Sequence, residues 1–140
     1  MHMLNRTRPF SHVLEQLRSV NLRPTRQRLA LAKLLFEKPD RHVTAEALHK
    51  EAAAEGARVS LATVYNTLHQ FTEAGLLKEI TVDAGCSYFD TNVASHHHCY
   101  DEDTGALMDI PAQHLQVVGS PAIPEGKSIR RIDIVVRVGD

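Results

Sequence analysis

Three consecutive histidines, His96, His97 and His98, stand just past the midpoint of the 140-residue sequence. Side chains alternate along a strand, so in an extended segment His96 and His98 share one face and His97 points to the other. Further nitrogen and oxygen donors stand at the ends of expected elements: His42, Asp90 and Asp109. Three imidazoles and two carboxylates without a thiolate suit Fe²⁺, Mn²⁺ or Zn²⁺ better than a thiolate-bound structural zinc. We therefore predict one metal site formed by His42, Asp90, His96, His98 and Asp109.

The alternative interpretation of the triplet is a surface histidine cluster that binds nothing. Its internal position argues against an expression tag, and the flanking acids favour metal or cofactor binding. Three further histidines, at positions 49, 69 and 114, are expected to face solvent.

Charge separates the two halves of the chain. Residues 1–80 hold 12 Lys and Arg against 8 Asp and Glu, a balance of +4, whereas residues 81–140 hold 4 against 9, a balance of −5. The sum is the formal net charge of −1, which by itself would argue against a polyanionic partner. A basic half joined to an acidic half is typical of a two-part DNA-binding regulator, although a solvated surface is the simpler interpretation.

Helices that could position these residues are predicted in the basic half. Capping residues and apolar periodicity predict helices over residues 11–20, 25–36, 44–56 and 60–75, with Ser11, Thr25, Thr44 and Ser60 at their starts. A hairpin is predicted over residues 77–82 and 87–90, with Gly85 in its turn. Short helices followed by a hairpin predict a winged helix, in which the third and fourth helices form the helix-turn-helix.

The fourth helix has two contrasting faces. Leu61, Val64, Leu68 and Phe71 form its expected buried stripe. The opposite surface suits DNA, because hydroxyl, amide and aromatic groups contact base edges while arginines contact phosphates. The predicted DNA-binding residues are Arg23, Arg26, Arg28, Ser60, Thr63, Tyr65 and Asn66. The alternative is a generic amphipathic helix in a small helical protein.

Short strands are predicted in the acidic half. They cover residues 97–100, 106–110 and 129–138, with one or two helical turns at 113–118 and a loop at 119–126. Such a small sheet buries little apolar surface alone, which predicts a homodimer. The expected organisation is a DNA-binding domain over residues 3–90, a hinge over 91–95, and a dimerisation and sensing domain over 96–140. The fold class is α/β (α+β), with an N-terminal winged helix and a small C-terminal α/β domain.

Three motifs carry a family resemblance. Arg-Pro-Thr-Arg-Gln-Arg at 23–28, Ser-Leu-Ala-Thr-Val-Tyr-Asn-Thr-Leu at 60–68 and Gly-Leu-Leu at 75–77 resemble the ferric uptake regulator (Fur) superfamily, over residues 11–138. The resemblance implies metal-dependent transcription control, as a dimer, at AT-rich inverted repeats of double-stranded DNA. It places Tyr65 on the family's base-contacting tyrosine. It also places the family's inter-domain sensing site on the five ligands predicted above.

Two positions depart from the family pattern. Asp101-Glu102-Asp103-Thr104 stands where most relatives carry a Cys-x-x-Cys, so we expect no structural zinc bound by four cysteines. Ile132 stands in the region where the second family site takes a histidine, so that site is expected to be damaged.

The missing cysteines and the histidine run most resemble the iron response regulator (Irr) branch. That branch implies haem as a cofactor at His96, His97 and His98, control of iron homeostasis and haem synthesis, and a possible haem-supplying protein as a partner. One rival is a peroxide-sensing metal-dependent repressor, which the aspartates at 90 and 109 resemble. Another is a haem- or metal-binding module without DNA binding. An enzyme is not expected, because so many ligands leave no open metal position.

Neither membrane insertion nor export is expected. The start Met1-His2-Met3 lacks an apolar signal region, and no apolar run approaches the length of about 18 residues that a transmembrane helix needs. The expected location is the cytoplasm, with Cys86 and Cys99 as free thiols.

Overall fold

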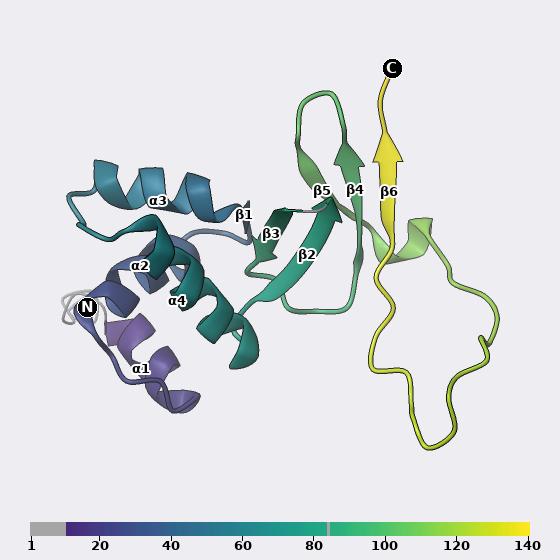
Figure 1. The fold of residues 1–140 in the computed structure, drawn as a ribbon, viewed down its shortest axis with the longest axis horizontal. Coiled ribbons are helices and arrows are strands. Elements are labelled where there is room, and N and C mark those ends of the chain that lie inside the picture. The colour runs from purple at the N-terminus through teal and green to yellow at the C-terminus, as the bar shows by residue number, and fades with distance from the viewer. Residues whose placement is uncertain (1–10, 84) are drawn as a thin grey trace, which may run out of the picture. The chain divides into compact units, whose positions relative to one another are not determined.

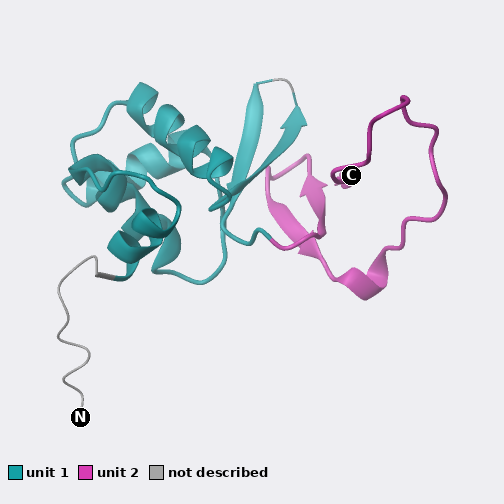
Figure 2. Ribbon diagram, turned by 90° about the horizontal axis from the view of Figure 1, so that it is seen from below, with its two compact units in different colours: residues 1–93 teal, residues 94–140 magenta. Residues whose placement is uncertain are grey.

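The computed structural model describes residues 11–83 and 85–140. The chain divides into two compact units, residues 1–93 and 94–140 (Figure 2). Each unit has its own sheet, so each is described separately below.

The first unit combines four helices with a small sheet (Figure 1). They are α1 Ser11–Ser19, α2 Arg26–Phe36, α3 Ala45–Ala54 and α4 Leu61–Glu73. The predicted caps of the last three helices are confirmed. The side chains of Thr25, Thr44 and Ser60 each accept a hydrogen bond from the backbone N–H three residues further on, which satisfies a group that the first turn leaves open.

The sheet of the first unit has the order β1-β3-β2 and is antiparallel. The predicted hairpin is confirmed as β2 Lys78–Asp83 and β3 Cys86–Asp90, and Gly85 has the positive φ of 78° that its turn needs. The two-residue strand β1, His42–Val43, was expected only as the entry to the third helix. Two residues are too few to show a strand period, and only pairing with β3 reveals the strand.

The core of the first unit lies between the helices and the hairpin. Val64, Leu68 and Phe71 of α4 are buried as predicted. Leu61 is not, since 36% of its surface is exposed, whereas Thr67 is buried at 4% exposure. Leu61 occupies the first turn of α4, where no element of the core cluster covers it. The buried stripe therefore keeps three of the four predicted residues and contains Thr67 in place of Leu61.

The second unit contains a sheet with the order β5-β4-β6. Strands β4 His97–Asp101 and β5 Leu107–Ile110 form the predicted antiparallel hairpin, and β6 Val135–Val138 runs parallel to β4. The prediction of a strand from residue 129 was wrong, because β4 offers ladder partners only from the pair His98–Val135 onward. One or two helical turns were predicted at 113–118, whereas the structure has a single 3₁₀ turn, η2 Ala112–His114.

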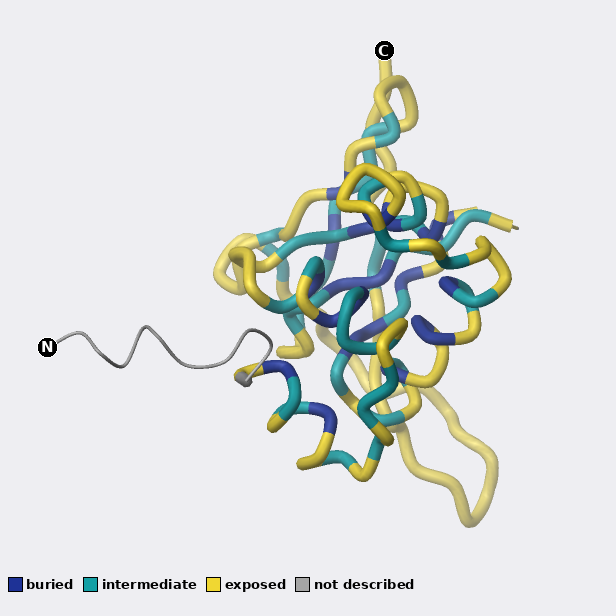
Figure 3. The backbone as a smooth tube through the Cα atoms, turned by 90° about the vertical axis from the view of Figure 1, so that its left-hand side faces the viewer, coloured by how far each residue is buried: buried dark blue, intermediate teal, exposed yellow. Residues whose placement is uncertain are grey.

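Apolar side chains remain exposed on the second unit. Met108, Val136 and Val138 on its strands are between 39% and 48% exposed. Most of residues 111–134 is exposed as well (yellow in Figure 3). Among the described residues, no helix combines the length and the apolar character needed to cross a membrane.

Candidate metal centre and nucleic-acid face

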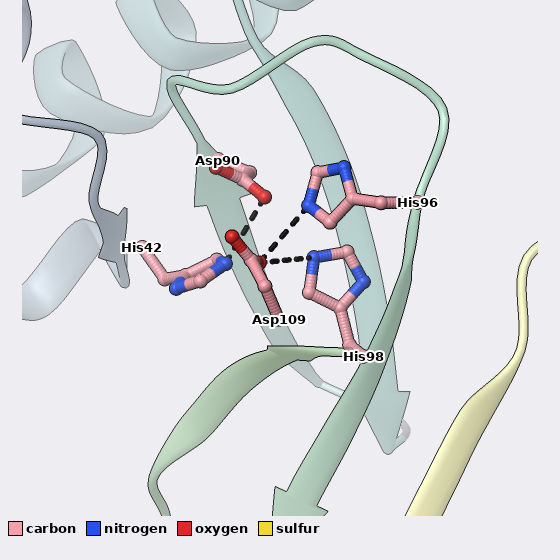
Figure 4. Close-up of side chains that lie close together, drawn as sticks. All are labelled: His42, Asp90, His96, His98 and Asp109. Carbon is pink, nitrogen blue, oxygen red and sulfur yellow. Dashed lines mark hydrogen bonds and ion pairs between the residues drawn. The ribbon is translucent and has the colours of Figure 1, made fainter. Parts of the chain in front are cut away.

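Two histidines and one aspartate converge on the second unit's sheet. His98 of β4 pairs in register with Asp109 of β5, and His96 immediately precedes β4 on the same face. Oδ1 of Asp109 lies 2.9 Å from Nε2 of His96 and 3.4 Å from Nε2 of His98 (Figure 4). The ligand atoms of the three residues all lie within 4.8 Å of one another. Donors about 2.0–2.2 Å from a shared metal are separated by about 3 Å, so this spacing fits a metal ion.

The hydrogen bonding of His96 strengthens that fit. Its Nδ1 lies 2.6 Å from the carbonyl oxygen of Ala94, which can only accept, so Nδ1 carries the proton. In a neutral ring, Nε2 then presents its lone pair to the carboxylate of Asp109. Two lone pairs at hydrogen-bond distance repel unless a proton or a metal ion lies between them. A backbone carbonyl behind a histidine is also the usual way to orient a metal ligand.

His97 lies on the other face of the strand, as alternation predicts. Its Nδ1 accepts a hydrogen bond of 3.1 Å from the backbone N–H of Ile134. It also lines a hollow of about 270 Å³ together with His96, Ile110 and Ile132, whereas His98 does not line this hollow. The triplet is therefore divided between two environments.

The first unit supplies a separate histidine–aspartate pair. His42 of β1 stands opposite Asp90 of β3, and its Nε2 lies 3.0 Å from Oδ2 of Asp90 (Figure 4). The buried Asp90 carboxylate also accepts a hydrogen bond of 2.8 Å from the backbone N–H of Asn92. Reciprocal bonds between Arg41 and Thr91 extend the pairing of the two strands. The ladder thus fixes both side chains.

Nitrogen and oxygen donors make up both groups. Such donors suit Mn²⁺, Fe²⁺ and Zn²⁺. Neither group uses Cys86 or Cys99, which are both free thiols. We call His42 with Asp90 the first ligand group, and we call His96, His98 and Asp109 the second ligand group.

Four of the predicted DNA-binding residues line one polar hollow of about 370 Å³. They are Arg23, Arg28, Thr63 and Asn66. Arg28 is already engaged there, because its guanidinium donates to Oε1 of Gln70, at 3.2 and 2.9 Å, and to the carbonyl oxygen of Arg23 at 2.8 Å. These bonds connect α2 to α4. Arg26 is exposed and lines a different hollow.

Ser60 and Tyr65 are held by other contacts. The hydroxyl oxygen of Ser60 caps α4, and the hydroxyl also donates to that of Thr63 at 2.9 Å. The hydroxyl of Tyr65 donates to Oε2 of Glu46 at 2.9 Å, and its ring stacks on His69 with centroids 6.4 Å apart. The hydrogen bond to the Glu46 carboxylate raises the pKa of Tyr65 above its ordinary value.

Sequence reasoning missed two residues around this face. Glu46 orients Tyr65, and Arg58 follows the turn between α3 and α4. Gln70 shares one face of α4 with positions 63, 66 and 67, as helical spacing predicts, and it holds Arg28. No local signal joins Glu46 to Tyr65, which is 19 residues away.

Comparison with known proteins gives the family. The sequence matches the model of the Ferric uptake regulator family over residues 19–136. A peroxide-responsive repressor PerR of Staphylococcus aureus (strain Mu50 / ATCC 700699) is 32% identical over 113 residues, which cover 78% of this chain and 76% of that protein. A peroxide operon regulator of Bacillus subtilis (strain 168) is 36% identical over 100 residues, which cover 71% and 68% of the two chains.

The fold has solved counterparts as well. The ferric uptake regulator from Pseudomonas aeruginosa with manganese aligns with a TM-score of 0.68 and 25% identity, over 91% of this chain and 96% of that chain. The predicted α/β fold, with a winged helix and a small second domain, is thereby confirmed. A match over most of the sequence, together with relatives above 30% identity, shows that this chain belongs to the ferric uptake regulator family of metal-responsive transcription regulators.

Proposed function

We propose that this protein is a dimeric repressor that binds AT-rich inverted repeats when its two ligand groups together hold one divalent metal ion. The observation that carries the proposal is the geometry of His96, whose Nε2 lies 2.9 Å from Oδ1 of Asp109 while its Nδ1 is bonded to the carbonyl of Ala94. The ligand set His42, Asp90, His96, His98 and Asp109 spans both units. Its closure on one ion would therefore couple metal binding to the arrangement of the two units.

The metal is proposed to be Mn²⁺ or Fe²⁺, with Zn²⁺ also able to bind in vitro. Carboxylates and imidazoles accept all three ions. The Pseudomonas aeruginosa regulator was solved with manganese, which supports the choice. A ligand changes DNA affinity only by binding one arrangement of the protein better than another. Ligands drawn from two units give such a differential affinity.

Peroxide is the proposed signal. The relatives of Staphylococcus aureus and Bacillus subtilis are named as peroxide regulators, which favours this signal over haem. Bound Fe²⁺ would activate the O–O bond of peroxide. Transfer of one oxygen atom into a ring C–H bond of His42 or His96 would oxidise the imidazole by two electrons, and the second oxygen would leave as water with no net change at the iron. The oxidised ring would no longer serve as a metal ligand. Loss of the ligand would release the metal and then the DNA.

Haem control at His96, His97 and His98, as in the iron response regulators, remains a prediction from the sequence. The contacts of His97 do not favour it. Its Nδ1 accepts a hydrogen bond from Ile134, so the proton of the neutral ring is on Nε2. Nε2 of the neutral ring then carries the hydrogen and offers no lone pair to an iron ion.

One titration separates these signals. The metal-free protein is mixed with a duplex that carries an AT-rich inverted repeat, and binding is followed by fluorescence anisotropy while Mn²⁺, Fe²⁺ or haem is added at fixed salt. We expect Mn²⁺ and Fe²⁺ to tighten binding and haem to leave it unchanged. Peroxide added to the Fe²⁺ protein should release the DNA and add one oxygen atom to a peptide containing His42 or His96.

The same titration can contradict the proposal. Release by haem, with no oxygen added after peroxide, would favour the haem-sensing alternative. Equal DNA affinity with and without metal would overturn metal-dependent binding altogether. The Mn²⁺ protein is the matched control for peroxide, because its histidines should stay unmodified.

A further inference from the structure

A second hollow lies beside the turn that joins α3 to α4. It has a volume of about 400 Å³ and is lined by Arg26, Gln27, Ala30, Gly56, Arg58 and Val59, among others. Both arginines are exposed, and none of the described lining residues is acidic. Among the residues that the structure describes, neither guanidinium forms a hydrogen bond or an ion pair. The hollow therefore carries the positive charges of two guanidinium groups, and no acidic side chain balances them.

The neighbouring hollow shows that this lack of compensation is local. It has a volume of about 440 Å³ and shares Ala30 and Ala57 with the hollow beside the turn. Its two lysines, Lys33 and Lys38, are accompanied by Glu37 and Glu55. Although it is the larger of the two, its charges balance, so it offers no anion site. The unbalanced charge belongs to Arg26 and Arg58.

The position of Arg26 and Arg58 indicates which anion they meet. Gln27 lines both this hollow and the polar hollow that contains Thr63 and Asn66 of α4. The arginines therefore stand next to the helix face that is proposed to meet base edges. A phosphate of the same duplex must lie close to any base that α4 contacts.

Local electrostatics favour a phosphate in this hollow. Arg26 is the first residue of α2, where the helix dipole places partial positive charge. An arginine fork also matches the oxygens of a phosphate in a bidentate manner. In contrast, the guanidinium of Arg28 already donates hydrogen bonds to Gln70 and to the carbonyl of Arg23, so Arg28 is a positioning residue for α4.

We propose that Arg26 and Arg58 together bind a DNA backbone phosphate in the hollow beside the α3–α4 turn. The inference rests on the proposed DNA-binding function and adds Arg58 to the residues that carry it. The contact is independent of sequence, whereas Thr63 and Asn66 discriminate between sequences.

The salt dependence of DNA binding tests this site. The full-length Mn²⁺ protein is titrated with the inverted-repeat duplex, and with a scrambled duplex of equal length, at several salt concentrations. Arg58→Gln should weaken binding to both duplexes by a similar factor. It should also make the slope of log K against log salt shallower by about 0.9 for each subunit, or about 1.8 for the dimer on the inverted repeat, because each subunit loses one phosphate contact. Arg58→Lys keeps the charge and should keep the slope.

Lys50→Gln is the matched control, because it removes the same charge from an exposed position of α3 outside both hollows. It should leave the slope unchanged, and thermal melting of each variant confirms its fold. An Arg58→Gln slope equal to that of the wild type or of Lys50→Gln would overturn the inference. Failure of the wild-type protein to bind either duplex would instead overturn the proposed function.

Discussion

At the scale of single residues, the orientation of His96 decides what its ring can bind. The Ala94 carbonyl fixes the proton on Nδ1, and this leaves Nε2 directed at Asp109. His98 approaches the same carboxylate oxygen from the neighbouring strand position. Metal binding by the second ligand group therefore depends on Asp109.

Replacement of Asp109 by asparagine is expected to abolish tight metal binding. The amide keeps the shape of the side chain but removes the charge that a cation requires. Loss of a group that only supports a ligand costs about 10–100-fold in affinity, so loss of a ligand should cost at least as much. Isothermal titration with Mn²⁺ measures the change. His97→Ala is the control, and an affinity loss equal to that of Asp109→Asn would place His97 in the site instead.

Tyr65 gives a prediction about pH. The Glu46 carboxylate accepts its hydroxyl proton and raises the pKa of Tyr65, so the phenolate should form at higher pH than in an ordinary tyrosine. Spectrophotometric titration of the phenolates should therefore show a transition that occurs at higher pH than that of free tyrosine. Glu46→Gln should move that transition to lower pH. Tyr65→Phe assigns it, and persistence of a late transition in that variant would contradict the assignment.

At the scale of elements, Arg41 joins β1, the strand that carries His42 of the first ligand group, to two helices. Its guanidinium forms a bidentate pair with Glu51 of α3 and donates to the carbonyl of Leu34 in α2 at 3.1 Å. Its backbone is bonded to Thr91, immediately after β3. The position of His42 is therefore tied to the helix that precedes α4.

The stability that the charge of Glu51 contributes should depend on pH in a defined way. The hydrogen bond from Arg41 holds the pKa of Glu51 below its ordinary value. A lowered folded-state pKa contributes stability above the unfolded value, about 4.3, and this contribution is lost as pH falls through the folded value. Glu51→Gln should cost about 1 kcal/mol at neutral pH, because the pair is partly solvated.

Urea unfolding at several pH values measures that cost. The difference between wild type and Glu51→Gln should shrink as the pH falls below about 4. Glu55→Gln, at the C-cap of α3, provides a control with the same change of charge. A cost for Glu51→Gln that does not vary with pH would show that packing, rather than the ion pair, is responsible.

At the scale of the whole molecule, the small second unit leaves apolar strand residues exposed. Val136 and Val138 of β6 are each 39% exposed, and no covering element among the described residues is assigned to them. A second copy of the chain would cover them in the proposed dimer. Val136→Glu should therefore convert the dimer to a monomer in sedimentation experiments. Ile123→Glu, in the exposed loop, should not, and a dimeric Val136→Glu protein would exclude β6 from the interface.

Local patterns were sufficient to predict most of the first unit. Side-chain caps at Thr25, Thr44 and Ser60 act over three residues, so their signals lie within a few positions of each other. The hairpin of β2 and β3 likewise depends on a glycine turn between two neighbouring strands. The candidate metal ligands were also identified from residue type and from their places at element ends.

Contacts between distant segments decided the remaining features. β1 exists because Asp90 and Phe89 pair with residues 46 or more positions earlier, and β6 is short because β4 is short. The bonds from Arg28 to Gln70 and from Tyr65 to Glu46 join separate helices. The proton position on His96 depends on one backbone carbonyl. Residue types and local spacing therefore determined the candidate ligands and the helices, whereas the fold decided their partners, because local signals do not record contacts made across the chain.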